Sequence, residues 1–151
     1  MRKLVLLLVF LPFIATSLLA ENKSLLNVDK NNLAIQGYDP VGFFNEKKPL
    51  KGKPEFKSVR QRVTYYFASA ENKARFDKEP DKFEPAFGGF CAYGVSRNKL
   101  VEIDPEAFQI LNGRLLLQYS KSVRNDFNKD PQANLTKANA NWPGLVERKG
   151  K

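Results

Sequence analysis

The sequence of 151 residues contains no histidine, one cysteine and one methionine. Without histidine, no Ser-His-Asp triad, Cys-His dyad or histidine-ligated zinc site can be built within this chain. With one cysteine, the chain can form neither an internal disulfide nor a Cys-x-x-Cys redox motif. A Walker loop and a dinucleotide-binding glycine fingerprint are also absent from the sequence. These absences favour a non-enzymatic protein.

Acidic residues are scarcer than basic ones, with 16 Asp and Glu against 25 Lys and Arg, and the formal net charge is +9. Such a charge raises the question of nucleic-acid binding. The basic residues are scattered, however, and the densest stretch, residues 46–57, is interrupted by two prolines and a glycine. This stretch predicts a solvated loop. Together with the export predicted below, the scatter argues against a nucleic-acid partner.

Only one long apolar run is present, at residues 4–14, and it follows Arg2 and Lys3. A positive start, a short apolar run and small residues after it are typical of a secretory signal peptide. We predict a signal peptide over residues 1–20 with cleavage after Ala20. Cleavage after Ser17 and an uncleaved anchor are the alternatives. The chain is then exported, periplasmic or secreted, has no membrane span after cleavage, and meets an envelope or extracellular partner.

The middle of the chain predicts a turn, one or two strands and a helix. Gly37 and Asp39-Pro40 favour a turn within residues 34–44, which follow a lead-in over residues 21–32. Residues 58–69 are rich in β-branched and aromatic side chains and predict strand. Ser69 is a typical N-cap for a helix that Pro80 ends.

The last third predicts a hairpin followed by two helices. Asn112-Gly113 lies between two apolar runs and favours a type I′ turn. Ser120 or Ser122 would cap the next helix, and Pro131 suits the start of the second. Residues 144–151 form a polar tail that we expect to be frayed. We recognise no internal repeat.

Several stretches in this order resemble the YHS domain family, in its exported, single-domain branch. They are AIQGYDPVGFF (34–44), TYYFASAENKARFDKEPDKFEP (64–85), GGFCAYGVS (88–96), DPEAFQILNGRLLLQYSK (104–121) and ANANWP (138–143). The resemblance covers residues 33–143. It implies an α+β fold with a small, treble-clef-like antiparallel sheet, helices packed on it and a helical C-terminal segment.

The resemblance does not extend to the family's metal site. Metal-associated members carry a cysteine after Asp-Pro-Val and two more in a Tyr-Phe-Cys-Ser-x-x-Cys run. The corresponding positions here are Gly42, Ala68 and Asn72, and the histidine often found upstream falls near Arg60. The resemblance therefore implies the fold and not this metal function.

Cys91 is the first candidate for a functional residue, and three interpretations are open. It could bind copper(I) or another thiophilic metal, react as a thiol, or pack as a small buried hydrophobe. Gly88 and Gly89 would let backbone approach a ligand, or allow a turn.

Four further residues are candidates for binding a ligand together with Cys91. Asp39 could be a ligand or an acid–base group, but an Asp before proline more often caps a turn. Tyr38, Tyr66 and Tyr93 could line a pocket, and half-buried packing is the alternative. The acidic run around Asp104-Pro105-Glu106 fits a turn or helix start better than a pair of catalytic carboxylates.

Three functions follow from these features. The first is a non-enzymatic binding module with a thiophilic metal or small ligand near Cys91. The second is an envelope interaction protein with a basic surface, no small ligand and Cys91 in the core. The third is a thiol-dependent redox partner, which needs an exposed Cys91 of low pKa.

Overall fold

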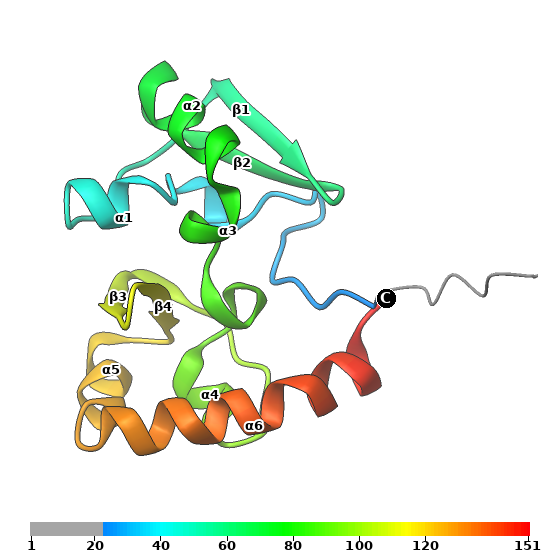
Figure 1. The fold of residues 1–151 in the computed structure, drawn as a ribbon, viewed down its shortest axis with the longest axis vertical. Helices are drawn as coiled ribbons and strands as arrows, with labels where there is room; N and C mark the ends of the chain where they lie inside the picture. Colours follow the sequence, from blue (N-terminus) through cyan, green and yellow to red (C-terminus); the bar gives the residue numbers. More distant parts are fainter. Residues whose placement is uncertain (1–22) are drawn as a thin grey trace, which may run out of the picture.

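The computed structural model describes residues 23–151, so the predicted signal peptide lies outside the described residues. The fold is α+β with a helical C-terminal segment, as predicted, but its strands form two separate two-stranded antiparallel sheets (Figure 1). None of the helices within residues 23–151 is both long and apolar enough to cross a bilayer.

The elements fall into two successive groups, which we call the first and the second unit. In Figure 1 the first unit occupies the upper part of the molecule and the second unit the lower part. The first unit contains the 3₁₀ helix η1 (Ile35–Gly37), α1 (Gly42–Asn45), β1 (Lys53–Arg60), β2 (Val63–Phe67), α2 (Ala70–Lys78) and α3 (Pro80–Phe83). The second unit contains η2 (Ala86–Gly89), α4 (Ala92–Ser96), β3 (Asp104–Leu111), β4 (Arg114–Gln118), α5 (Lys121–Phe127) and α6 (Pro131–Lys149).

The second unit repeats the first at an offset of 51 residues. β1 and β3 are the same length, as are β2 and β4, and each pair of strands is joined by a two-residue turn. Each hairpin has one irregularity in its register, between Lys53 and Lys57 in the first and between Asp104 and Phe108 in the second. The interpretation of the sequence as free of repeats was therefore wrong.

The same offset is visible in the sequence once the structure points to it. Six identities relate residues 53–80 to residues 104–131: Pro54 and Pro105, Glu55 and Glu106, Ser69 and Ser120, Phe76 and Phe127, Lys78 and Lys129, Pro80 and Pro131. Most have a structural role that recurs. Both serines cap the next helix, both phenylalanines are buried, and both prolines begin a helix.

The serine caps confirm the two helix starts that the sequence predicted. The Ser69 hydroxyl accepts a hydrogen bond from the Asn72 N–H at 3.1 Å, and the Ser120 hydroxyl accepts one from the Val123 N–H at 3.1 Å. Such a bond satisfies one of the backbone donors that a helix start leaves free. Ser120, and not Ser122, is the cap of α5.

The hairpin turn at Asn112-Gly113 is also confirmed. Both residues have positive φ, 52° and 74°, as a type I′ turn requires. The acidic run that begins at Asp104 starts strand β3 and not a helix, so that alternative was wrong. The Asp104 side chain still supports a local turn, because it accepts a hydrogen bond from the Glu106 N–H at 2.9 Å.

Two further predictions need correction at the element boundaries. The stretch predicted as a solvated loop, residues 46–57, contributes its last five residues to β1, where Lys53 pairs with Phe67 and Lys57 with Tyr66 of β2. The predicted frayed tail is helical, since α6 continues through Pro143 to Lys149. Leu145 is buried in the core of the second unit, and this packing holds the last turns of α6 in place.

The two hairpins differ in how many of their faces are covered. Along β2, buried and half-buried side chains alternate, as in a strand with one face on the core. Along β4, Leu115, Leu116 and Leu117 are all buried. Leu115 and Leu117 belong to the apolar core that includes the first unit, whereas Leu116 belongs to the core under α6. β4 is therefore shared by both cores and joins the two units.

Candidate functional site

Cys91 is buried, with 1% of its surface exposed, and it acts as the N-cap of α4. The Gly94 N–H donates to its Sγ at 3.4 Å, and its thiol donates to the Gln118 Oε1 at 3.3 Å. Gln118 Oε1 also accepts from the Tyr93 N–H at 3.0 Å. Cys91 and Gln118 therefore anchor the start of α4 together, which agrees with the packing interpretation of this thiol.

Gly88 and Gly89, shortly before Cys91, allow another segment of the backbone to pack closely against them. A Cβ on Gly88 would lie 2.0 Å from the Leu25 carbonyl oxygen, a distance that no side chain can occupy. The neighbouring Asn27 N–H donates to the Gly88 carbonyl at 2.8 Å. Gly88 and Gly89 also have positive φ, 58° and 84°. The segment that precedes the first unit is thus what approaches these glycines.

Asp39 occupies in the first unit the place that Cys91 has in the second, at an offset of 52 residues. It is fully buried, and its Oδ1 accepts from the N–H groups of Val41 at 2.8 Å and Gly42 at 3.3 Å. Its Oδ2 accepts from the Ala68 N–H at 2.8 Å and from the Asn72 Nδ2 at 2.7 Å. All four contacts are donors to the carboxylate, so Asp39 caps the turn that leads into α1 and ties it to the end of β2.

The Asp39 contacts include all three positions that the resemblance assigns to metal-binding cysteines. Gly42 lies far from Ala68 and Asn72 in the sequence, yet each of the three donates a hydrogen bond to this carboxylate. An amide side chain and backbone N–H groups supply donors, whereas a metal ion needs electron-pair donors. The chemistry of this cluster therefore fits a buried hydrogen-bond network that stabilises the fold, and it does not fit a metal site.

The neighbours of Cys91 do not suit a thiophilic metal either. Its Sγ faces one backbone N–H and one amide oxygen, and copper(I) prefers thiolates and thioethers. Within residues 23–151, no group of three His, Cys, Asp or Glu side chains is placed to hold an ion.

The three candidate tyrosines do not converge on Cys91. Only Tyr93 is adjacent, and the Arg97 side chain donates to its hydroxyl at 2.6 Å. Tyr38 is half-buried under the Lys51 ammonium, which lies 4.3 Å from the ring centroid. Tyr66 is half-buried on β2, where it packs against Gly52. Tyr66 also lies beside Gly37, next to Tyr38, so these two tyrosines belong to the first unit and Tyr93 to the second.

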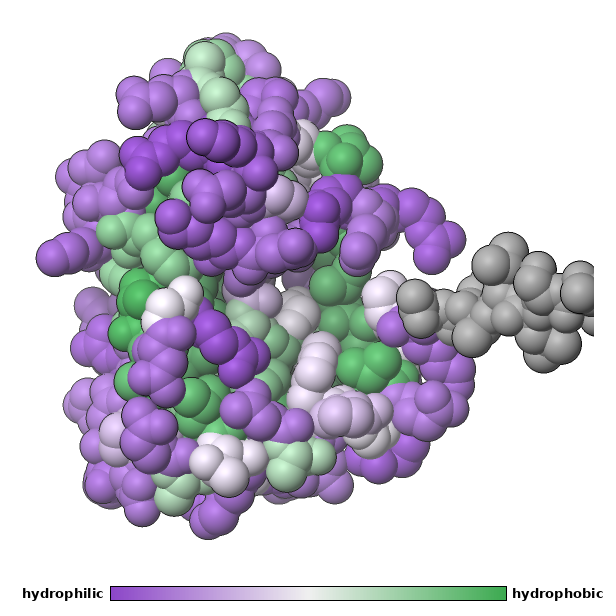
Figure 2. Space-filling model, in the orientation of Figure 1, coloured by the Kyte–Doolittle hydropathy of each residue, from purple (hydrophilic) through white to green (hydrophobic). Residues whose placement is uncertain are grey.

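A cavity of about 430 Å³ lies instead between the two units. Figure 2 shows apolar side chains gathered in the middle of this face, with hydrophilic residues around them. Five parts of the chain line this cavity: the segment before the first unit, β2, the stretch from α3 to η2, the β3–β4 turn with the start of β4, and α6. We call it the inter-unit cleft.

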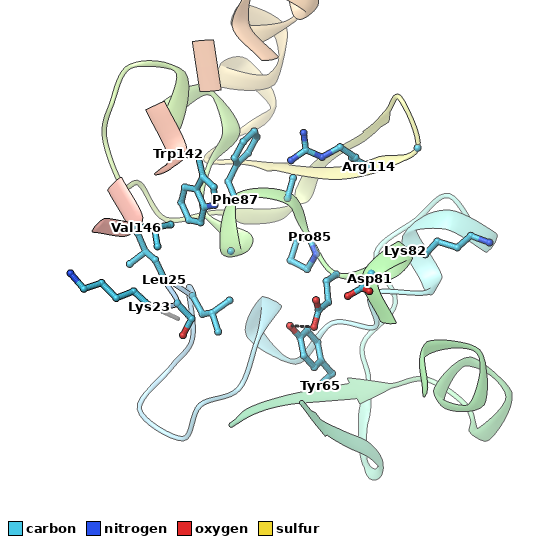
Figure 3. Close-up of a pocket in the computed structure, with 16 residues that line it drawn as sticks. Lys23, Leu25, Tyr65, Asp81, Lys82, Pro85, Phe87, Arg114, Trp142 and Val146 are labelled. Carbon is cyan, nitrogen blue, oxygen red and sulfur yellow. Dashed lines mark hydrogen bonds between the residues drawn. The ribbon is translucent and has the colours of Figure 1, made fainter. Parts of the chain in front are cut away.

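The second-unit side of the inter-unit cleft is aromatic. Trp142 on α6 and Phe87 on η2 pack edge to face, with ring centroids 5.9 Å apart (Figure 3). The Arg114 guanidinium lies over the Phe87 ring at 4.9 Å, and its Nη1 donates to the Asn139 Oδ1 at 2.9 Å. Leu25 and Val146 complete this apolar wall.

The opposite side of the cleft is polar. The Tyr65 hydroxyl lies 3.4 Å from the Glu84 Oε1 and donates to it (Figure 3). The Arg60 guanidinium, outside the cleft lining, pairs with Glu84 at 3.0 Å. Burial raises the pKa of Glu84 more than Arg60 lowers it. Burial, then the Glu84 charge, raises the pKa of the Tyr65 phenol, so it stays protonated at neutral pH.

The inter-unit cleft contains none of the five residues that the sequence predicted as a site. Its members come from five places in the chain, and no local pattern links them. Trp142, the only tryptophan, was the one signal available, because a half-buried indole on a polar helix marks an apolar contact.

Searches with protein-family models, against curated proteins and against solved structures found no match to this chain. The resemblance to the YHS domain family therefore stays a prediction.

Proposed function

We propose that this protein is an exported, non-enzymatic binding module with a YHS-like fold that holds a small ligand in the inter-unit cleft. The observation that carries the proposal is the cleft itself, with an aromatic wall opposite a hydrogen-bonding wall. Small-ligand sites are typically apolar hollows with a few placed polar groups, often between substructures.

The ligand class follows from the two walls. The Trp142 and Phe87 side favours a flat apolar group, which would pack against the rings. The Tyr65 O–H donates to Glu84, so the Tyr65 oxygen and the Glu84 carboxyl group offer acceptors to a ligand hydroxyl or amide. A neutral aromatic alcohol or amide has this combination.

The experiment is an NMR titration of the protein with 2-naphthol, read on backbone amides and on the Trp142 indole N–H. We expect the largest shifts at Leu25, Phe87 and Trp142. W142F should weaken binding at least about threefold, since it removes indole contact area but keeps a ring. The matched control is Y119F, an exposed aromatic residue outside the cleft.

Two outcomes would overturn the proposal. One is equal binding by W142F and the native protein. The other is a set of shifts centred on Gly94 and Gln118, which would move the ligand to the thiol. A thiol-labelling arm tests that alternative, and we expect Cys91 to be labelled only after unfolding, with or without copper(I), because it is 1% exposed.

The second candidate is the envelope interaction protein with Cys91 in its core. The burial of Cys91 and its bonds to Gly94 and Gln118 favour it. It predicts association with acidic macromolecules that weakens steeply with salt, and no binding of 2-naphthol. Burial of the same thiol weighs against the redox-partner interpretation.

A further inference from the structure

A second hollow, of about 570 Å³, lies on the other side of the segment before the first unit. We call it the basic groove. Figure 1 shows the β1–β2 turn and the end of α6 on the same side of the molecule, with the segment from Lys23 between them. Its lining is Ser24, Leu25, Leu26, Val28, Asp29, Lys30, Asn32, Gln61, Arg62, Val63, Lys149 and Lys151.

Four cationic side chains from three separate parts of the chain line the basic groove: Lys30, Arg62, Lys149 and Lys151. None of them forms an ion pair with another residue of the described part of the chain. One acidic side chain, Asp29, lines the groove, and its Oδ1 already accepts from the N–H groups of Asn31 and Leu33. Even with a terminal carboxylate on Lys151 counted, the groove carries a net positive charge.

The floor of the basic groove is apolar. Leu25, Leu26 and Val28 are half-buried, and Val63 is buried. Cations around an apolar floor fit a ligand that joins an anionic head to a short hydrocarbon part. Neither feature alone selects such a ligand, since scattered lysines are common on surfaces.

The β1–β2 turn provides an independent observation. Its two residues, Gln61 and Arg62, have positive φ of 49° and 68°, in the left-handed region that favours Asn and Gly. The equivalent turn of the second unit has Asn112 and Gly113, which fit that conformation. The first unit keeps two long polar side chains in a strained turn, and both line the basic groove. Backbone strain of this kind is concentrated at functional positions.

We propose that the basic groove binds a soluble alkyl phosphate monoester or a molecule of equivalent chemistry. Arg62 on the β1–β2 turn and Lys149 at the end of α6 both line the groove and contact the phosphate. The alkyl part lies on Leu25, Leu26 and Val63. The groove shares Ser24, Leu25 and Leu26 with the lining of the inter-unit cleft. Arg62, Val63 and Lys149 line the groove alone, so amide shifts at residues 61–63 distinguish binding here from binding in the cleft.

The test is an NMR titration of the full chain with hexyl phosphate, inorganic phosphate and hexyl glucoside. Hexyl phosphate should shift the amides of residues 24–28 and 61–63 and bind more tightly than either other probe. Increasing salt should weaken its binding. R62Q/K149Q should bind it about tenfold more weakly, because two of four cations are removed.

The matched control is K57Q/K78Q, which removes the same charge from exposed lysines outside the groove. An equal loss of affinity in this control would overturn the proposal, because net charge alone would then explain binding. Inorganic phosphate binding as tightly as hexyl phosphate would overturn the role of the apolar floor. Binding to phosphatidylglycerol vesicles without any binding of hexyl phosphate would replace the soluble ligand with a membrane surface.

Discussion

In the first unit one carboxylate, Asp39, accepts hydrogen bonds from the start of α1 and from the end of β2. In the second unit two residues are used: Cys91 caps α4, and Gln118 at the end of β4 accepts hydrogen bonds from Cys91 and Tyr93. The backbone N–H groups of Asp39 and Cys91 make corresponding hydrogen bonds. Asp39 N–H donates to Leu50 and Cys91 N–H to Val101, at 2.8 and 3.0 Å. Cys91 therefore occupies a helix-capping position that corresponds to Asp39 in the first unit. This structural role explains its position without a reactive thiol.

The two hairpins show a second difference. At equivalent positions, β2 has half-buried Thr64 and β4 has buried Leu115. β2 packs on one core, whereas β4 lies between two, and its sequence Arg-Leu-Leu-Leu-Gln lacks the alternation of a one-sided strand. The units are therefore alike in backbone and unlike in burial.

The largest expected effect concerns the two caps. D39A should lower the free energy of unfolding by about 4 kcal/mol, because several buried donors lose their acceptor and each such loss costs about 1–3 kcal/mol. C91A should cost only about 1 kcal/mol, because sulfur is a weak acceptor and the Gln118 bond to Tyr93 remains. Urea unfolding of both variants measures the difference.

The control for the cap comparison is D29A, which removes a carboxylate from an exposed loop where it also accepts backbone hydrogen bonds. It should cost about 1 kcal/mol. If C91A destabilised the protein as much as D39A, the two caps would not be equivalent and Cys91 would need another explanation.

An exchange of turns sharpens the hairpin comparison. Replacing Gln61-Arg62 with Asn-Gly should raise the free energy of unfolding by about 1 kcal/mol, since it removes left-handed strain. Replacing Asn112-Gly113 with Gln-Arg should lower it by about as much. Thermal unfolding of both variants checks these signs. An unchanged stability in both would show that the two turns are equally relaxed.

The smallest expected effect is a pH dependence at the junction of the units. Burial raises the pKa of Glu84, so its contribution to the free energy of unfolding is fully present below the ordinary glutamate pKa of about 4.3. That contribution is lost as the pH rises through the folded-state pKa. The stability of E84Q relative to the native protein should therefore increase as the pH rises above the ordinary glutamate pKa.

Urea unfolding at several pH values measures this trend, and Y65F is the control, because it removes the phenol but keeps the carboxyl group. A stability difference between E84Q and the native protein that decreased over the same range would mean that Arg60 stabilises the charged Glu84 more than burial opposes it.

The sequence by itself determined the local structure. The cap at Ser69, a cap at Ser120 or Ser122, the turn at Asn112-Gly113 and the helix start at Pro131 were predicted, because each depends on side chains and backbone within a few residues. The tendency of Asp39 to cap its turn was likewise predicted from the proline that follows it.

Only the tertiary structure decided the rest. The repeat is carried by few identities, because backbone geometry and burial can be kept by many side chains. The inter-unit cleft and the basic groove assemble residues from distant parts of the chain, so no local pattern could predict them. The burial of Cys91 and the continuation of α6 past Pro143 depend on long-range packing, which outweighs local propensity where apolar surface is buried.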